Sequence, residues 1–123
     1  MRPDGKEIIL KTKSFDFAVR VTRLYKYILE TKHENVLNKQ LLRSGTAIGA
    51  LVREAQNAES KADFIHKLAI AQKECDETIY WLELLKTTEF ISKKEFDSIY
   101  KDAIALLKMI RSAIITVKRT KGL

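Results

Sequence analysis

Apolar side chains recur every three or four residues along most of the chain, which is the pattern of one face of an α-helix. The first such run predicts a helix from about Ser14 to Lys32, preceded by an N-terminal arm of residues 1–13. Its apolar face consists of Phe17, Ala18, Val21, Leu24, Tyr25 and Ile28. The polar stretch at residues 31–35 then predicts a turn.

A second helix is predicted to end near Asn57. Its apolar face advances in alternating steps of four and three residues, through Leu37, Leu41, Ser44, Ile48, Leu51 and Ala55. Ser60, followed three residues later by Asp63, resembles a capping box and predicts the start of a third helix. The face of this third helix consists of Phe64, Leu68, Ala71, Cys75, Thr78, Leu82 and Leu85.

A clearer capping box, formed by Ser92 and Glu95, predicts the start of a fourth helix. Ile91 and Phe96 flank this box at the spacing of a hydrophobic staple, which fixes how the chain enters a helix. The helix is predicted to run to about Arg119. Its apolar face consists of Phe96, Ile99, Ala103, Leu106, Ile110, Ala113 and Val117.

The connections between these four helices are only two to five residues long in this reading, so neighbouring helices must run antiparallel. The predicted fold is therefore all-α, an antiparallel up-down-up-down four-helix bundle that forms a single domain over residues 14–120. The chain length agrees with a single domain, because 123 residues is a typical size for one domain. Four glycines and one proline are too few for a sandwich or barrel with many tight turns.

Some apolar residues of the third and fourth helices lie off these faces: Ile70, Trp81, Leu84, Ile104 and Ile115. A second apolar face usually meets a partner helix, most simply from another copy of the same chain, so we expect a homo-oligomer. A broader core stripe is the alternative, and it would absorb some of these residues. No apolar run reaches 18 residues and the N-terminus lacks a signal-peptide core, so we expect no membrane association and a cytoplasmic location.

Basic residues dominate both ends of the chain. The net charge is +7, and residues 108–123 hold five cations and no acid. In an antiparallel bundle the end of the fourth helix lies near the start of the first. The candidate cations for one basic surface are Lys11, Lys13, Arg20, Arg23, Lys118, Arg119 and Lys121.

Such a surface would bind the phosphates of RNA or DNA with little sequence preference. The alternative is a solvated face that aids solubility and complements the dipole of a helix C-terminus. A scaffold that binds only other proteins then remains open as a second function.

Enzyme chemistry finds little support in the sequence. Glu30 with His33, and Asp63 with His66, have spacings used in di-iron bundles, but the first pair falls at a helix end and His66 points away from the core. Cys75 lies on an apolar face, where a thiol is inert. We therefore expect no enzymatic activity, no metal or cofactor and no small-molecule substrate.

Gly45 and Gly49 stand one turn apart inside the second helix. A helical glycine costs about 1 kcal/mol against alanine, so a compensating contact is needed. Close approach of a neighbouring helix is the interpretation that fits this spacing. Anion binding by a glycine-rich loop is the alternative, but it needs a helix N-terminus, and these residues lie about two turns inside the helix.

Four blocks that occur in order resemble the four-helix-bundle family of the 23S rRNA intervening sequences. They lie at residues 40–50 (QLLRSGTAIGA), 54–56 (EAQ), 59–68 (ESKADFIHKL) and 77–82 (ETIYWL). The resemblance covers about residues 14–115 and implies a small bundle that assembles into a ring, often a pentamer. It also implies a fold similar to that of the accessory proteins of diversity-generating retroelements, which carry a basic surface.

Carried over by position, the family's Arg-Ser pair falls on Arg43 and Ser44, and its acidic residue falls on Glu54. This chain departs from the family at Ala47, where Ser is common, and at Leu51, where Asn is common. The loss of two polar groups favours packing over a polar site on this helix.

Overall fold

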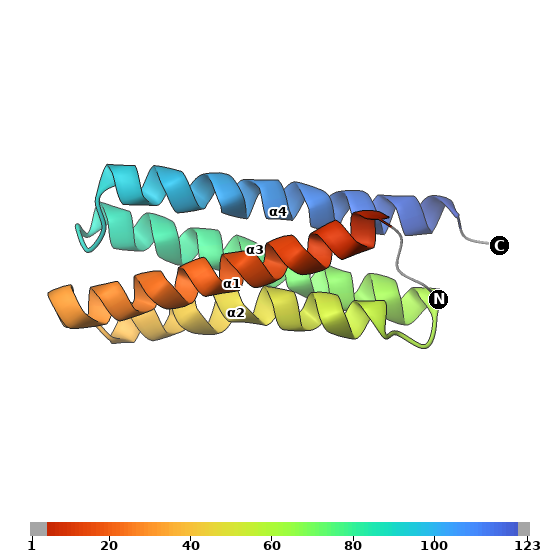
Figure 1. The fold of residues 1–123 in the computed structure, drawn as a ribbon, viewed down its shortest axis with the longest axis horizontal. Helices are drawn as coiled ribbons and strands as arrows, with labels where there is room; N and C mark the ends of the chain where they lie inside the picture. The colour runs from red at the N-terminus through yellow and green to blue at the C-terminus, as the bar shows by residue number, and fades with distance from the viewer. Residues whose placement is uncertain (1–4, 121–123) are drawn as a thin grey trace.

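The computed structural model describes residues 5–120 and consists, over that range, of four α-helices. They are α1 (Gly5–Lys32), α2 (Val36–Gln56), α3 (Lys61–Thr87) and α4 (Lys93–Arg119) (Figure 1). Contacts join α1 to α2, α2 to α3, α3 to α4 and α1 to α4, which closes the four helices into a bundle. The predicted all-α four-helix bundle is confirmed.

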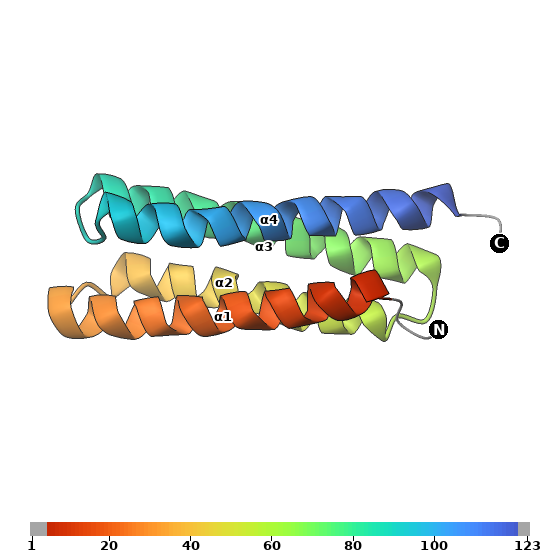
Figure 2. The same cartoon turned by 45° about the horizontal axis from the view of Figure 1, so that its top comes forward.

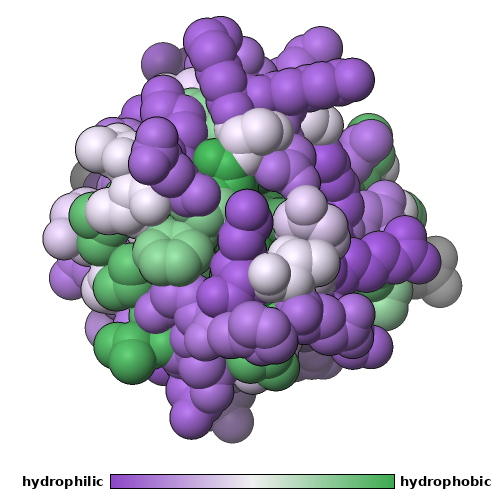
Figure 3. Space-filling model, turned by 90° about the vertical axis from the view of Figure 1, so that its left-hand side faces the viewer, coloured by the Kyte–Doolittle hydropathy of each residue, from purple (hydrophilic) through white to green (hydrophobic). Residues whose placement is uncertain are grey.

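The bundle has two layers, with α1 and α2 in one and α3 and α4 in the other (Figure 2). The start of α1, the end of α4 and the connection between α2 and α3 share one end of the molecule (Figure 1). The opposite end carries the α1–α2 and α3–α4 connections. Hydrophilic side chains cover most of that face, with small apolar areas between them (Figure 3). Between residues 5 and 120, no helix combines the length and apolarity needed to cross a bilayer.

Helix α1 begins earlier than the sequence pattern predicted. It starts at Gly5 rather than near Ser14, so the expected N-terminal arm over residues 1–13 is wrong from Gly5 onward. The physical reason is that Leu10 and Ser14 continue the buried stripe of Phe17 and Val21 at helical spacing. The side-chain amide of Gln56 holds this added turn to α2 by donating a 2.6 Å hydrogen bond to the Glu7 carbonyl.

The helix starts at Ser60 and Ser92 are confirmed. The Ser60 hydroxyl accepts a hydrogen bond from the amide of Asp63, and the Ser92 hydroxyl accepts one from the amide of Glu95. Glu95 completes the capping box, since its carboxylate accepts from the Ser92 amide at 2.8 Å. Ile91 and Phe96, the predicted staple, are both buried.

In each two-helix layer, the first helix is followed by a residue whose backbone has the left-handed conformation. His33 follows α1 with φ 56° and Glu89 follows α3 with φ 69°. This conformation turns the chain out of a helix, and glycine is the residue that usually adopts it. After His33 the carboxylate of Glu34 caps α2 by accepting from the amides of residues 36, 37 and 38.

The core runs along the bundle axis and is lined by all four helices. All seven residues predicted for the apolar face of the third helix are buried, from Phe64 to Leu85. On α2 the buried set also includes Asn38, Gly45 and Val52, so its inner face is wider than the predicted stripe. The side-chain amide of the buried Asn38 donates a 2.9 Å hydrogen bond to the Tyr25 carbonyl, which reduces the cost of burying it.

The two glycines of α2 face α1 at different distances. A Cβ placed on Gly45 would lie 2.7 Å from a methyl carbon of Val21, closer than real Cβ atoms approach. A Cβ on Gly49 would meet the backbone oxygen of Ser14 at 3.3 Å. A side chain is therefore least tolerated at Gly45, where the two methyl groups of Val21 occupy the place of a Cβ, whereas the near neighbour of Gly49 is the backbone of α1.

We predict that Gly45→Ala lowers the free energy of unfolding by about 1–3 kcal/mol, because Val21 is fully buried and cannot move aside without strain. Gly49→Ala is the matched variant. There the milder contact is offset by the helix propensity of alanine, worth about 1 kcal/mol, so its effect should be much smaller. Urea titrations followed by circular dichroism measure both. Equal losses in the two variants would contradict the assignment of Gly45 as the tight point.

Candidate nucleic-acid interface

The end of the bundle that holds the start of α1 and the end of α4 collects exposed cations. Lys11 and Lys13 lie on the first turns of α1, and Lys118 and Arg119 form the last turn of α4. The two helix ends are neighbours, since residues 6–10 and residues 109–120 line one common cleft. The antiparallel bundle therefore brings both ends of the sequence to one surface.

Two further lysines at this end were not among the sequence candidates. Lys6 lies on the first turn of α1, in the segment that was expected to be an arm. Lys61 opens α3, and its ammonium group donates to the backbone carbonyl of Thr120 at the end of α4. The antiparallel topology predicts the position of Lys61, because the start of α3 must lie beside the end of α4.

We call these six residues the basic end. They are Lys6, Lys11, Lys13, Lys61, Lys118 and Arg119. Within residues 5–120, no salt bridge joins a carboxylate to Lys11, Lys13, Lys118 or Arg119. Their charges are therefore directed mainly to solvent. Lys118 and Arg119 also stabilise α4, since cations complement the partial negative charge of a helix C-terminus.

Arg20 is not part of the basic end. Its guanidinium forms an ion pair with Asp102 and donates to the hydroxyl of Ser98 at 2.9 Å, so it is engaged with the first half of α4. Arg23 is exposed on α1 and lies one helical turn farther from that end. Lys121, the remaining candidate, lies outside the described residues.

A polar cluster joins α2 to α3 on the outside of the bundle. The Arg43 guanidinium contacts the carboxylates of Glu74 at 3.2 Å and Glu77 at 2.6 Å. Hydrogen bonds to these two acids raise the pKa of Arg43, and the Arg43 guanidinium in turn lowers the pKa of Glu77. The indole of Trp81 donates to Glu77 at 3.2 Å, so this carboxylate holds two partners.

A buried hydroxyl pair lies directly beneath this cluster. Thr78 donates to the Ser44 hydroxyl at 2.9 Å, and both side chains are fully buried. Ser44 also donates to the Gln40 carbonyl of its own helix at 3.0 Å. Because unpaired hydroxyls are costly in a core, this contact favours one register of α2 against α3.

The residues considered for catalysis or metal binding are placed apart. Cys75 is fully buried and its thiol contacts the Ala103 carbonyl at 3.4 Å. Burial, with a smaller contribution from the charge of Asp76, raises the pKa of Cys75 to about 12. His33 and His66 are exposed. Across residues 5–120, no three His, Cys, Asp or Glu side chains are grouped so as to hold a metal ion.

Comparison with known proteins identifies the family. The sequence profile of the 23S rRNA-intervening sequence protein matches residues 6–112, which is most of the chain. The chain belongs to this family. The resemblance read from the four sequence blocks is thereby confirmed, and the match extends to the first turn of α1.

A solved structure that is similar to this chain has the same fold. It is described as a protein with unknown function from the S23 ribosomal protein family of Bacteroides thetaiotaomicron. The two sequences are 50% identical over 89% of this chain and 97% of that one, with a TM-score of 0.88. No curated protein matches the chain.

The positions to which the sequence resemblance assigned a family motif have structural partners in this chain. Arg43 contacts the two acids of α3, and Ser44 meets Thr78. Glu54 accepts from the ammonium of Lys67 at 3.1 Å, which adds a third link between α2 and α3. Leu51 packs on the core, and Ala47 is half-buried. These side chains join α2 to α3 rather than surround a cavity.

The five residues proposed for an oligomer interface differ in exposure. Ile70, Trp81, Leu84 and Ile104 are half-buried, and Trp81 packs on the core. Ile115 is 48% exposed. Further large apolar side chains reach solvent on α1, α2 and α3. They are Ile8, Ile9, Phe15, Tyr27, Val36 and Tyr80.

We predict that Cys75 makes stability fall at alkaline pH. Its folded pKa of about 12 lies above the ordinary value, so its contribution is complete below about pH 8.5 and is lost as pH rises toward 12. At pH 10 the loss relative to Cys75→Ala should be about 2 kcal/mol, because only the unfolded thiol ionises. Urea unfolding of both proteins at pH 7 and pH 10 measures it. A parallel pH dependence in the two proteins would contradict the prediction.

Proposed function

We propose that this protein is a non-enzymatic, ring-like homo-oligomer that binds the phosphate backbone of RNA or DNA through its basic end. The observation that carries the proposal is the meeting of α1 and α4, which places cations from both ends of the sequence on one surface. The family name links relatives of this chain to inserts in 23S rRNA and is consistent with a nucleic-acid partner.

The chemistry of the basic end favours phosphate over base recognition. Lysine and arginine side chains neutralise phosphates and release condensed counterions, which gives affinity without sequence preference. Base stacking needs free aromatic faces. Phe15 is the exposed aromatic residue on the same half of α1, and the guanidinium of Arg53 covers its ring at 5.6 Å from the centroid.

Assembly into a ring would increase the positive electrostatic potential of the basic ends. In a ring each subunit contributes one basic end, so an extended polyanion can contact several subunits at once and gain avidity. Exposed apolar side chains such as Ile115 and Tyr80 supply area for contacts between subunits. The single cysteine does not favour a catalytic role, because a buried thiol with a raised pKa is a poor nucleophile.

We predict that a fluorescent 20-nucleotide RNA and the matching DNA duplex both bind with affinity that falls steeply with salt. Lys118→Glu with Arg119→Glu should weaken binding at least tenfold and reduce the salt slope by about 2, since two phosphate contacts are removed per subunit. Fluorescence anisotropy at several KCl concentrations measures both effects.

The matched control is Lys93→Glu with Lys94→Glu. These are also adjacent exposed cations of α4, but they lie at the opposite end of the bundle. The control changes net charge equally and should bind almost as the unmodified protein does. Equal losses in the two double variants would show that net charge alone matters. Absence of binding, or binding that does not respond to salt, would favour the protein–protein scaffold instead.

We predict a particle mass of two or more times 14.2 kDa in light scattering. Ile115→Glu should shift this mass toward the monomer, because burying an unpaired carboxylate opposes association. Val36→Glu is the control, since Val36 is 78% exposed at the loop-bearing end. A monodisperse 14.2 kDa particle from the unmodified protein would refute the oligomer.

A further inference from the structure

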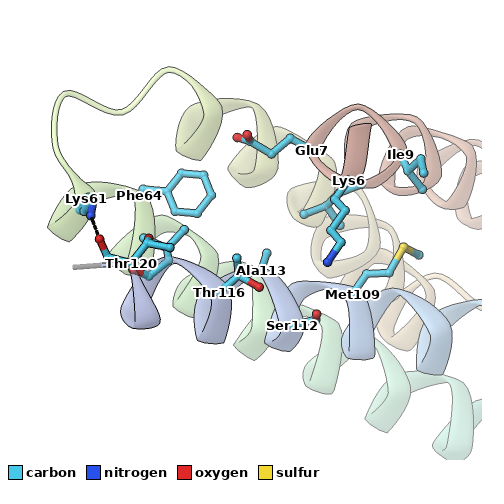
Figure 4. Close-up of a pocket in the computed structure, with 12 residues that line it drawn as sticks. Lys6, Glu7, Ile9, Lys61, Phe64, Met109, Ser112, Ala113, Thr116 and Thr120 are labelled. Carbon is cyan, nitrogen blue, oxygen red and sulfur yellow. Dashed lines mark hydrogen bonds between the residues drawn. The ribbon is translucent and has the colours of Figure 1, made fainter. Parts of the chain in front are cut away.

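An apolar cleft lies between the start of α1 and the end of α4, with α3 closing one side (Figure 4). Its volume is about 480 Å³, within the range of small-ligand sites. The cleft occurs where the bundle is least closely packed, since α1 contacts α4 more sparsely than any other neighbouring pair does. It therefore follows from the packing of the fold.

The interior of the cleft is made of hydrocarbon. Its apolar lining consists of Ile9, Leu10, Phe64, Met109, Ala113 and Val117. Ile9, which lines the cleft, is 51% exposed. Exposed apolar surface of this kind is stabilised by an apolar ligand. A nucleobase would instead need polar groups placed to pair with its edge.

Two lysines line the cleft. The ammonium group of Lys61 is bound to the Thr120 carbonyl, which leaves Lys6 to pair with a charged group. Lys6 extends from α1 across the cleft toward α4, with its amino group directed to the side of Met109 and Ser112 (Figure 4). The carboxylate of Glu7 lies toward Phe64, at the other side of the cleft (Figure 4). An anionic headgroup is therefore favoured beside Lys6.

We propose that this cleft binds an unbranched alkyl carboxylate, with its chain along α4 and its carboxylate paired to Lys6. The lining of α4 runs from Met109 to Thr120, about 16 Å at the rise of an α-helix. This length suits an extended acyl chain of roughly twelve carbons. The volume of about 480 Å³ is that of a small-ligand site, and Lys6 supplies the charge complementary to a carboxylate.

The decisive measurement uses the two methionines of the chain, Met1 and Met109. With ¹³C-methyl-methionine labelling, the intact protein gives two methyl resonances, and Met109→Leu assigns them. Dodecanoate, added below its micelle concentration and without nucleic acid, should shift the Met109 resonance saturably at one ligand per chain. Dodecyltrimethylammonium, which has the same chain and the opposite charge, should bind at least tenfold more weakly.

Two variants with matched controls locate the ligand. Ala113→Trp fills the cleft and should abolish the shift, whereas Ala105→Trp on the exposed face of the same helix should not. Lys6→Glu should weaken dodecanoate binding at least tenfold, whereas Lys26→Glu, exposed on the same helix, should leave it within twofold. Circular dichroism confirms that each variant remains helical.

An unmoved Met109 resonance in the unmodified protein would overturn the proposal, and this readout needs no variant to fold. Equal binding of the anionic and cationic surfactants would overturn the role of Lys6. A change in particle mass by Ala113→Trp, without saturable dodecanoate binding to the unmodified protein, would identify a second subunit as the occupant. None of these outcomes depends on whether the basic end binds RNA or DNA.

Discussion

The missing side chain at Gly45 sets how closely α1 can lie against α2. The methyl groups of Val21 occupy the place of its Cβ, and one turn later Gly49 lies against the backbone of Ser14, so α1 is fixed along α2. The rest of the α1 layer depends on this contact. It places Arg20 against Asp102 of α4, and it leaves the first turns of α1 beside the last turns of α4. The basic end and the neighbouring cleft are both consequences of where α1 lies.

Helix α2 also fixes the position of α3. Ser44, one residue before Gly45, meets Thr78 in the core, and Arg43 meets the acids of α3 at the surface. A short segment of one helix thus fixes neighbours on two sides. This accounts for why Arg43 and Ser44 stand next to Gly45 in the sequence, although they contact different helices. Their shared role is to set distance and register inside the bundle.

The sequence predicts the fold well because helical periodicity and capping chemistry are local. Every buried residue of α3 follows from spacing alone, as do the caps at Ser60 and Ser92. It predicts the site less completely. The start of α1 was missed because Leu10 and Ser14 extend the stripe with only one large apolar residue. The pairing of Arg20 with Asp102 joins positions far apart in sequence, and periodicity gives no signal for it. Lys61 required the topology before it could be placed.

The left-handed residues His33 and Glu89 give the loop-bearing end a distinct character. Two chain reversals there use side chains in a conformation that glycine adopts at lower energy. In the unfolded chain, however, His33 and Glu89 have less conformational entropy than glycine would have. Each chain reversal therefore loses less entropy on folding. The two turns therefore have a higher conformational energy in the folded state and a lower conformational entropy in the unfolded state. Both lie at the end of the bundle farthest from its cationic surface.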